Sequence, residues 1–160
     1  LRRRSLDDVS ALKSLGLLAA ELGNSEPSEK LGDSDEEALM SEGLVAMSEG
    51  NLDRAENIFT KLIEVNPYFT EAWNKRATLR FMVWDFEGSL KDVEKVLALE
   101  PRHFGALSGL GMIYLRLGDP ESALKAYEDL VDIFPSNADA IQKIISLKDY
   151  LGINKYSHYL

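Results

Sequence analysis

Three prolines recur at one fixed interval, and this interval constrains the fold more than any other feature of the 160-residue chain. Pro67, Pro101 and Pro135 stand 34 residues apart, and the residues between them repeat in chemical type as well as in spacing. A period of this length is typical of stacked structural repeats, in which each unit buries its apolar face against its neighbours. The sequence therefore predicts a repeat array rather than an enzyme fold.

Aligning the units on their prolines places small residues in some columns and large apolar residues in others. The small columns hold Gly43, Ala77 and Gly111, and Ala55, Ser89 and Ala123; the large columns hold Leu39, Trp73 and Leu107, Phe59, Val93 and Tyr127, and Leu62, Val96 and Leu130. A small residue lets two helix backbones approach, and a large one fills the space beside it. Each unit is therefore predicted to be an antiparallel helix pair, with Gly50 and Gly118 in the turns of the first and third units.

These columns resemble the tetratricopeptide repeat, whose pattern is W-x2-L-G-x2-Y, then A-x3-F, then P, at a period of 34 residues. The third unit matches at Leu110, Gly111, Tyr114, Gly118, Ala123, Tyr127 and Pro135, and the first at Gly43, Gly50, Ala55, Phe59 and Pro67. The second unit departs from the pattern, since it keeps Trp73 and Pro101 but carries Arg76, Ala77, Arg80, Trp84 and Ser89 at the other positions. The resemblance implies an all-α, right-handed α-solenoid of helical hairpins.

The expected organisation has three parts. Residues 1–23 form an amphipathic helix, because leucines and a valine recur at helical spacing, and residues 24–34 form an acidic flexible linker. The repeat domain occupies residues 35–160, with repeats at 35–69, 70–103 and 104–137 and a capping helix or partial repeat at 138–160. Gly152 lies where the turn of a fourth unit would fall.

The first residues of the chain allow three readings. Leu1 to Ser5 read Leu-Arg-Arg-Arg-Ser, which suits the end of a targeting segment, a phosphorylation site or a solvated helix start. A start at Leu1 rather than methionine leads us to expect a processed form or an excised fragment. Parts of the second and third units look bacterial in type, so the expected locations are the cytoplasm or an organelle of bacterial descent.

Composition and residue types disfavour several function classes. The chain has no cysteine and a formal net charge of −9, which argues against thiolate metal sites, disulfides and nucleic-acid binding. No apolar run approaches the length of a membrane helix, so we expect a soluble protein without membrane insertion. His103 and His158 are the only histidines, and no nucleophile, phosphate loop or metal-ligand spacing accompanies them. The chain is therefore expected to have no enzymatic activity, cofactor or metal.

A binding function has a more specific basis. In the tetratricopeptide repeat family the first helix of each unit lines a concave groove, and the resemblance assigns particular motif positions to that groove. The predicted groove residues are Met40, Leu44, Met47, Asn74, Thr78, Phe81, Met82, Ser108, Met112, Leu115 and Arg116, which include all four methionines of the chain. Methionine side chains adapt readily to apolar partners. The sequence therefore predicts a scaffold or adaptor that binds an apolar helical or extended protein segment.

Two other functions remain open. In the first, the chain is a structural subunit of a larger assembly, and its own residues 1–23 fill the groove. In the second, the chain is a co-chaperone. Family members of this kind hold the acidic tails of chaperones with a set of Lys, Asn and Arg residues. The matching positions here are Met40, Leu44, Lys75, Gly105 and Gly109, of which only Lys75 suits a carboxylate. This composition disfavours chaperone-tail binding, and no oligomeric state is implied.

Trp84 stands in the predicted turn of the second unit, where the pattern has glycine. If it packs against the neighbouring unit, Trp84 extends the core. If it is exposed, it is a candidate surface anchor for a partner, because exposed aromatic residues contribute much of the energy of association.

Overall fold

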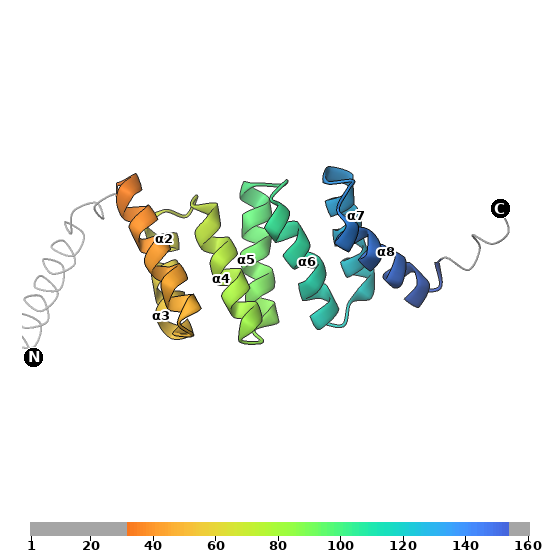
Figure 1. Ribbon diagram of the computed structural model, residues 1–160, viewed down its shortest axis with the longest axis horizontal. Helices are drawn as coiled ribbons and strands as arrows, with labels where there is room; N and C mark the ends of the chain where they lie inside the picture. The colour runs from red at the N-terminus through yellow and green to blue at the C-terminus, as the bar shows by residue number, and fades with distance from the viewer. Residues whose placement is uncertain (1–31, 154–160) are drawn as a thin grey trace, which may run out of the picture.

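The computed structural model describes residues 32–153, which form a row of seven α-helices without strands (Figure 1). The helices are α2 (Asp33–Ser48), α3 (Leu52–Val65), α4 (Thr70–Met82), α5 (Phe86–Leu99), α6 (Phe104–Arg116), α7 (Pro120–Ile133) and α8 (Ala138–Tyr150). The all-α solenoid expected from the sequence is confirmed. The expected helix at residues 1–23, the linker as far as residue 31 and the residues from 154 onward lie outside the described residues. Helix α2 begins two residues before the expected start of the repeat domain at residue 35.

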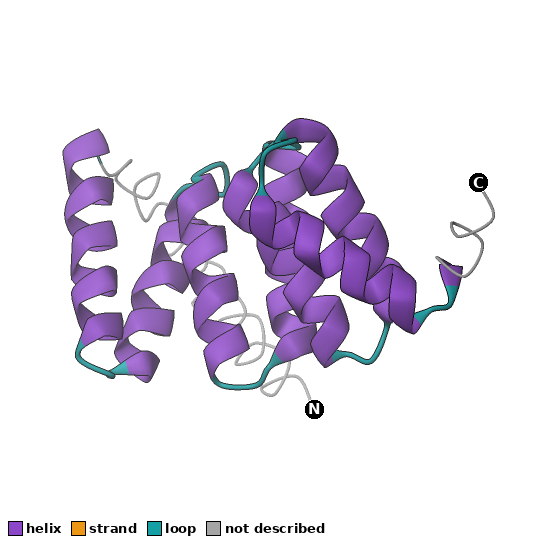
Figure 2. Ribbon diagram, turned by 45° about the vertical axis from the view of Figure 1, so that its right-hand side comes forward, coloured by secondary structure: helices purple, strands orange, loops and turns teal. Residues whose placement is uncertain are grey.

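Short turns join α2 to α3, α4 to α5 and α6 to α7 as helical hairpins (Figure 2). Gly50 and Gly118 hold φ angles of 76° and 75° in the first and third turns, and Gly152 follows α8 with a φ of 72°. Glycine adopts this left-handed conformation without the steric cost that a Cβ atom brings. The helix after each hairpin turn then begins at a side-chain cap, because Asn51, Asp85 and Asp119 accept hydrogen bonds from the backbone N–H three residues later.

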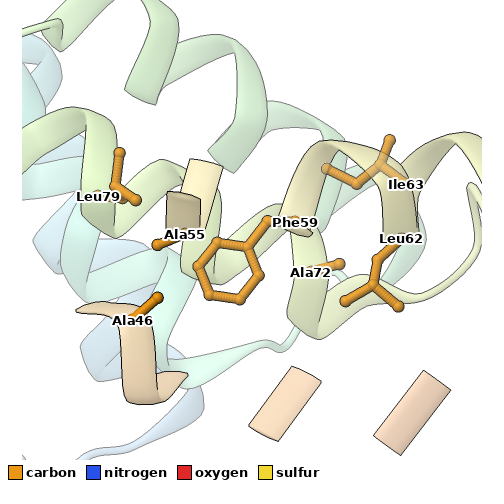
Figure 3. Packing of buried hydrophobic residues seen from close by; sticks show 7 residues of the cluster. All are labelled: Ala46, Ala55, Phe59, Leu62, Ile63, Ala72 and Leu79. Atoms are coloured by element: carbon orange, nitrogen blue, oxygen red, sulfur yellow. The ribbon is translucent and has the colours of Figure 1, made fainter. Parts of the chain in front are cut away.

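The small and large columns meet face to face inside the hairpins. A Cβ atom added to Gly43 would lie 2.5 Å from the Phe59 ring, and one added to Gly111 would lie 2.5 Å from the Tyr127 ring. Phe59 is fully buried among residues of α2, α3 and α4 (Figure 3). Because each ring occupies the space that a side chain would need, glycine is required where the helices cross.

The second hairpin departs from the repeat pattern because it contains a charged network. Asp92 on α5 is 2% exposed and accepts hydrogen bonds from Arg76 at 2.8 Å, through both carboxylate oxygens, and from Arg80 at 3.2 Å. The same arginines reach back to α3, where Arg76 donates to Thr60 and Arg80 pairs with Glu56. Arg76 and Arg80 therefore connect two adjacent hairpins through hydrogen bonds.

Helix α8 closes the described array at the end opposite α2 (Figure 1). Its Ala140 and Leu147 join the core cluster that contains Tyr127, whereas Ile145 is exposed on the other side. A helix with one packed and one solvated face is what the end of a repeat array requires. None of the helices between residues 32 and 153 combines the length and the apolar character that crossing a membrane demands.

Candidate functional site

A hollow of about 250 Å³ lies between α4 and α6, and two residues of α5 also line it. We call it the central hollow. Its lining residues are Asn74, Ala77, Thr78, Phe81, Ser89, Val93, Phe104, Gly105, Ser108, Gly109, Met112 and Ile113. The hollow lies between two repeats, because α4 and α5 belong to the second hairpin and α6 to the third. Neither repeat forms it alone.

The walls of the central hollow are mainly apolar and partly exposed. Phe104 and Met112 on α6 are 49% and 46% exposed, and Phe81 faces them from α4. Gly109 leaves the α6 wall open, because a Cβ atom added there would meet nothing within 4 Å. Apolar side chains around an open concavity favour the insertion of an apolar group from a partner.

One end of the central hollow carries a hydrogen-bonded histidine. The Nδ1 atom of His103 accepts a hydrogen bond from the Ala106 backbone N–H at 3.1 Å, which caps α6. With Nδ1 as acceptor, the ring proton of the neutral imidazole resides on Nε2, which donates to Glu71 on α4 at 2.8 Å. This pair places the carboxylate of Glu71, whose side chain is 47% exposed, at the N-terminal ends of α4 and α6.

The opposite end carries aromatic rings and a cation. Phe81 and Phe86 pack edge to face with their ring centroids 5.2 Å apart, and Trp84 lies 5.7 Å from Phe86. The guanidinium of Arg116, at the C-terminal end of α6, lies over Phe81 at 5.8 Å and over Trp84 at 5.7 Å. These distances suit cation–π contacts. The two ends of the site therefore differ in charge.

The structure brings together some of the predicted groove residues. Asn74, Thr78, Phe81, Ser108 and Met112 line the central hollow. Arg116 adjoins it through its contact with Phe81. Leu115 and Met82 are exposed near the C-terminal ends of α6 and α4 and are not among the lining residues. Trp84 is exposed rather than packed into the core, since 72% of its surface is accessible.

Helix α2 behaves differently from the prediction of a methionine-lined groove. Met40 and Met47 are partly buried and pack against the core cluster around Phe59, whereas Leu44 is exposed. Only Met112 among the four methionines lines the central hollow. Sequence reasoning also missed Ser89 and Val93, because it assigned the groove to first helices only and α5 is a second helix. Gly109, which has no side chain, could have indicated open space at this position of α6.

Chemistry-bearing clusters are sparse in the described part of the chain. Between residues 32 and 153, no three His, Asp or Glu side chains gather in a way that would hold a metal ion. His103 is engaged in helix capping and in its contact with Glu71. His158 lies outside the described residues.

Known proteins resemble this chain in sequence and in fold. A TPR repeat-containing protein of Rhizobium etli is 37% identical over 110 residues, which are 69% of this chain and 54% of that protein. The small glutamine-rich tetratricopeptide repeat-containing protein 2 of Saccharomyces cerevisiae is 30% identical over 119 residues, which are 74% of this chain and 33% of that protein. This chain thus spans about half of the first relative and a third of the second.

Two solved structures show the same architecture. The first TPR domain of Spaghetti (RPAP3), bound to an HSP90 peptide, superimposes with a TM-score of 0.71 at 23% identity, over 78% of this chain and 99% of that one. MamA superimposes with a TM-score of 0.71 at 21% identity, over 85% of this chain and 76% of that one. Family models described as tetratricopeptide repeat match residues 36–69 and 85–138, together more than half of the chain. The chain therefore belongs to the tetratricopeptide repeat family.

Proposed function

We propose that this chain is a non-enzymatic interaction scaffold that binds an apolar helical or extended segment of another protein in the central hollow. The observation that carries the proposal is the apolar wall formed by the half-exposed Phe104 and Met112 and the partly buried Phe81 around open space at Gly109. Covering these side chains removes apolar surface from water, which is the main favourable term in protein association. Members of this family are generally interaction modules, which supports the same class of function.

Polar groups inside the central hollow favour a peptide over a small apolar molecule. The side chains of Asn74 and Ser108 line the wall, and neither forms a side-chain hydrogen bond with the residues described here. An amide offers both donors and an acceptor, and a hydroxyl offers one donor and an acceptor. A peptide backbone supplies complementary groups, so these residues can hold its register while the apolar wall holds a side chain.

Recognition of an acidic chaperone tail has weaker support. The Spaghetti domain is described with an HSP90 peptide bound, but that likeness concerns the fold. The positions that the family uses for the tail carboxylates hold Met40, Leu44, Lys75, Gly105 and Gly109 here, and four of these five side chains cannot pair with a carboxylate.

The proposal is tested by selecting short random peptides on phage against the full chain and measuring the affinity of the enriched peptides by fluorescence anisotropy. We expect enriched peptides with apolar residues on one face. Gly109→Phe should weaken their binding by about tenfold or more, because the new ring fills the central hollow. Ala98→Phe is the matched control, since it adds the same ring at an exposed position of α5 outside the lining residues.

Two results would count against this function: no enrichment, or peptides that bind the Gly109→Phe variant as tightly as the wild type. Competition by a peptide of residues 5–22 would instead assign the site to the chain's own segment. Those residues lie outside the described part of the chain, so this occupant stays a prediction.

A further inference from the structure

Trp84 occupies a backbone conformation that bulky residues avoid. Its φ angle is 69°, and the corresponding turn positions hold glycine in Gly50, Gly118 and Gly152, with φ angles of 72° to 76°. A Cβ atom clashes with the backbone in this left-handed region, so a tryptophan there strains the turn. The second hairpin therefore has a strained tryptophan at the turn position where the neighbouring hairpins have an unstrained glycine.

Burial does not offset this strain, because 72% of the Trp84 surface is exposed. The ring contacts Phe86 on one side and the guanidinium of Arg116 on another, and the adjoining Met82 and Val83 are also about half exposed. Strained residues gather at ligand clamps and active sites, where their position serves binding. The position of Trp84 beside the central hollow fits a role in holding a partner.

The guanidinium of Arg116 lies over the Trp84 ring and is a candidate binding group for an acidic side chain. It forms no ion pair with any carboxylate between residues 32 and 153, although the chain has 27 acidic and 18 basic residues. The guanidinium lies over the rings of Phe81 and Trp84. Its N–H donors form a planar fork that matches a carboxylate in geometry. The cation adjoins the central hollow, because Met112 lies one helical turn before it on α6 and Phe81 lines the wall.

We propose that Trp84 and Arg116 form an acid-binding end of the site. A segment bound in the central hollow places an apolar side chain between α4 and α6 and an aspartate or glutamate side chain, about one helical turn away, on Arg116. Glu71 at the opposite end repels a second acid, so the segment binds in one direction. This inference rests on the proposed function and adds the charge and the orientation of the partner.

The first test compares peptides selected from the same random library by the wild type and by Arg116→Glu, both as full chains. The wild type should enrich an acidic residue at a constant spacing from the apolar positions, and Arg116→Glu should enrich lysine or arginine there. Replacing the selected acid by its amide should weaken binding to the wild type by about tenfold. Arg116→Lys keeps the charge without the fork of donors, so its affinity for the acidic peptide should lie between those of the wild type and Arg116→Glu.

The second test separates binding from folding at Trp84. Trp84→Gly should leave Tm unchanged or raise it, because glycine relieves the strained turn. The same substitution should weaken the binding of the selected peptide by about tenfold. A residue with only a structural role would show the reverse, a lower Tm with unchanged affinity, and that result would overturn the proposal.

The outcomes also distinguish this inference from the proposed function. Apolar peptides that Gly109→Phe blocks but that carry no acidic preference would leave the proposed function standing and remove the role of Arg116. An acidic preference that Arg116→Glu leaves unchanged would likewise contradict this inference. The absence of any groove-binding peptide would remove both.

Discussion

Tyr127 shows how tightly single residues determine the packing of this chain. The ring of Tyr127 fills the space beside Gly111, and the side chain is 1% exposed. Its hydroxyl has no hydrogen-bond partner among residues 32–153. The packing and the hydroxyl have separate consequences for stability, and each can be measured.

Gly111→Ala should destabilise the folded chain by about 2 kcal/mol, because the added methyl group would lie 2.5 Å from a buried ring. Gly109→Ala, two positions earlier on the same helix, should stabilise it by about 0.5–1 kcal/mol, because alanine reduces the freedom of the unfolded chain and meets open space. Urea denaturation of the two variants measures the contrast. Equal effects of the two substitutions would show that the ring yields to the methyl group.

Tyr127→Phe should leave the chain as stable as the wild type at neutral pH or more stable by about 1 kcal/mol, because it removes a buried hydroxyl without a partner. Burial raises the pKa of Tyr127 above its ordinary value, and the carboxylate of Asp139 adds to the shift. The folded chain therefore holds this proton more tightly than the unfolded chain. Its contribution is fully present below the unfolded pKa of about 10 and is lost as the pH rises through the folded pKa.

The wild type should consequently lose stability more steeply than Tyr127→Phe above about pH 10, as measured by urea denaturation at a series of pH values. Parallel curves for the two proteins would mean that the tyrosine titrates alike in the folded and unfolded chains.

At the scale of elements, the charged network around Asp92 joins α4 to α5 beside their apolar contacts. Asp92→Ala should destabilise the chain by about 3 kcal/mol, because it leaves the buried guanidinium of Arg76 without its carboxylate. Glu56→Gln, at the more exposed end of the network, should cost less than about 1 kcal/mol. Denaturation curves of both variants test the difference.

A double variant identifies the source of the loss. Arg76→Met combined with Asp92→Leu should recover most of the stability lost in Asp92→Ala, because it removes both charges and keeps the volume apolar. If the double variant is no more stable than Asp92→Ala, the network contributes specific geometry that apolar packing cannot replace.

At the scale of the whole molecule, the proposed binding site lies where the second and third hairpins meet. Each hairpin packs on its neighbours along the chain, and α4 also contacts α6 across the central hollow. A ligand in the central hollow therefore couples the second and third hairpins, whereas α2 and α8 lie at the ends of the described array (Figure 1). In a repeat array, such coupling acts on the interface between two units.

Hydrogen exchange measured with a saturating selected peptide should show slower exchange in α4 and α6 than in the free protein, with smaller changes in α2 and α8. Ligand binding lowers the population of locally opened states at the bound elements. Protection concentrated in α2 and α3 would instead place the ligand near Met40 and Leu44, the part of the predicted groove that the central hollow does not include.

The sequence by itself determined the elements and their partners. The period of 34 residues located the hairpins, and the columns predicted small residues where the helices approach and large apolar residues that fill the space beside them. These features depend on spacing within one unit, where helical periodicity decides which side chains share a face. The position of Trp84 in a turn was also predictable, although its exposure was not.

Only the tertiary structure decided which inner residues converge. The resemblance assigns Met40, Met47 and Met112 to the groove. Met40 and Met47 pack, partly buried, against the core cluster around Phe59, whereas Met112 lines the central hollow. The contact of Arg116 with Phe81 and Trp84 joins two repeats, as does the hollow itself. The angle and distance between adjacent hairpins set such contacts, and these result from the summed packing of many side chains instead of the spacing of any one motif.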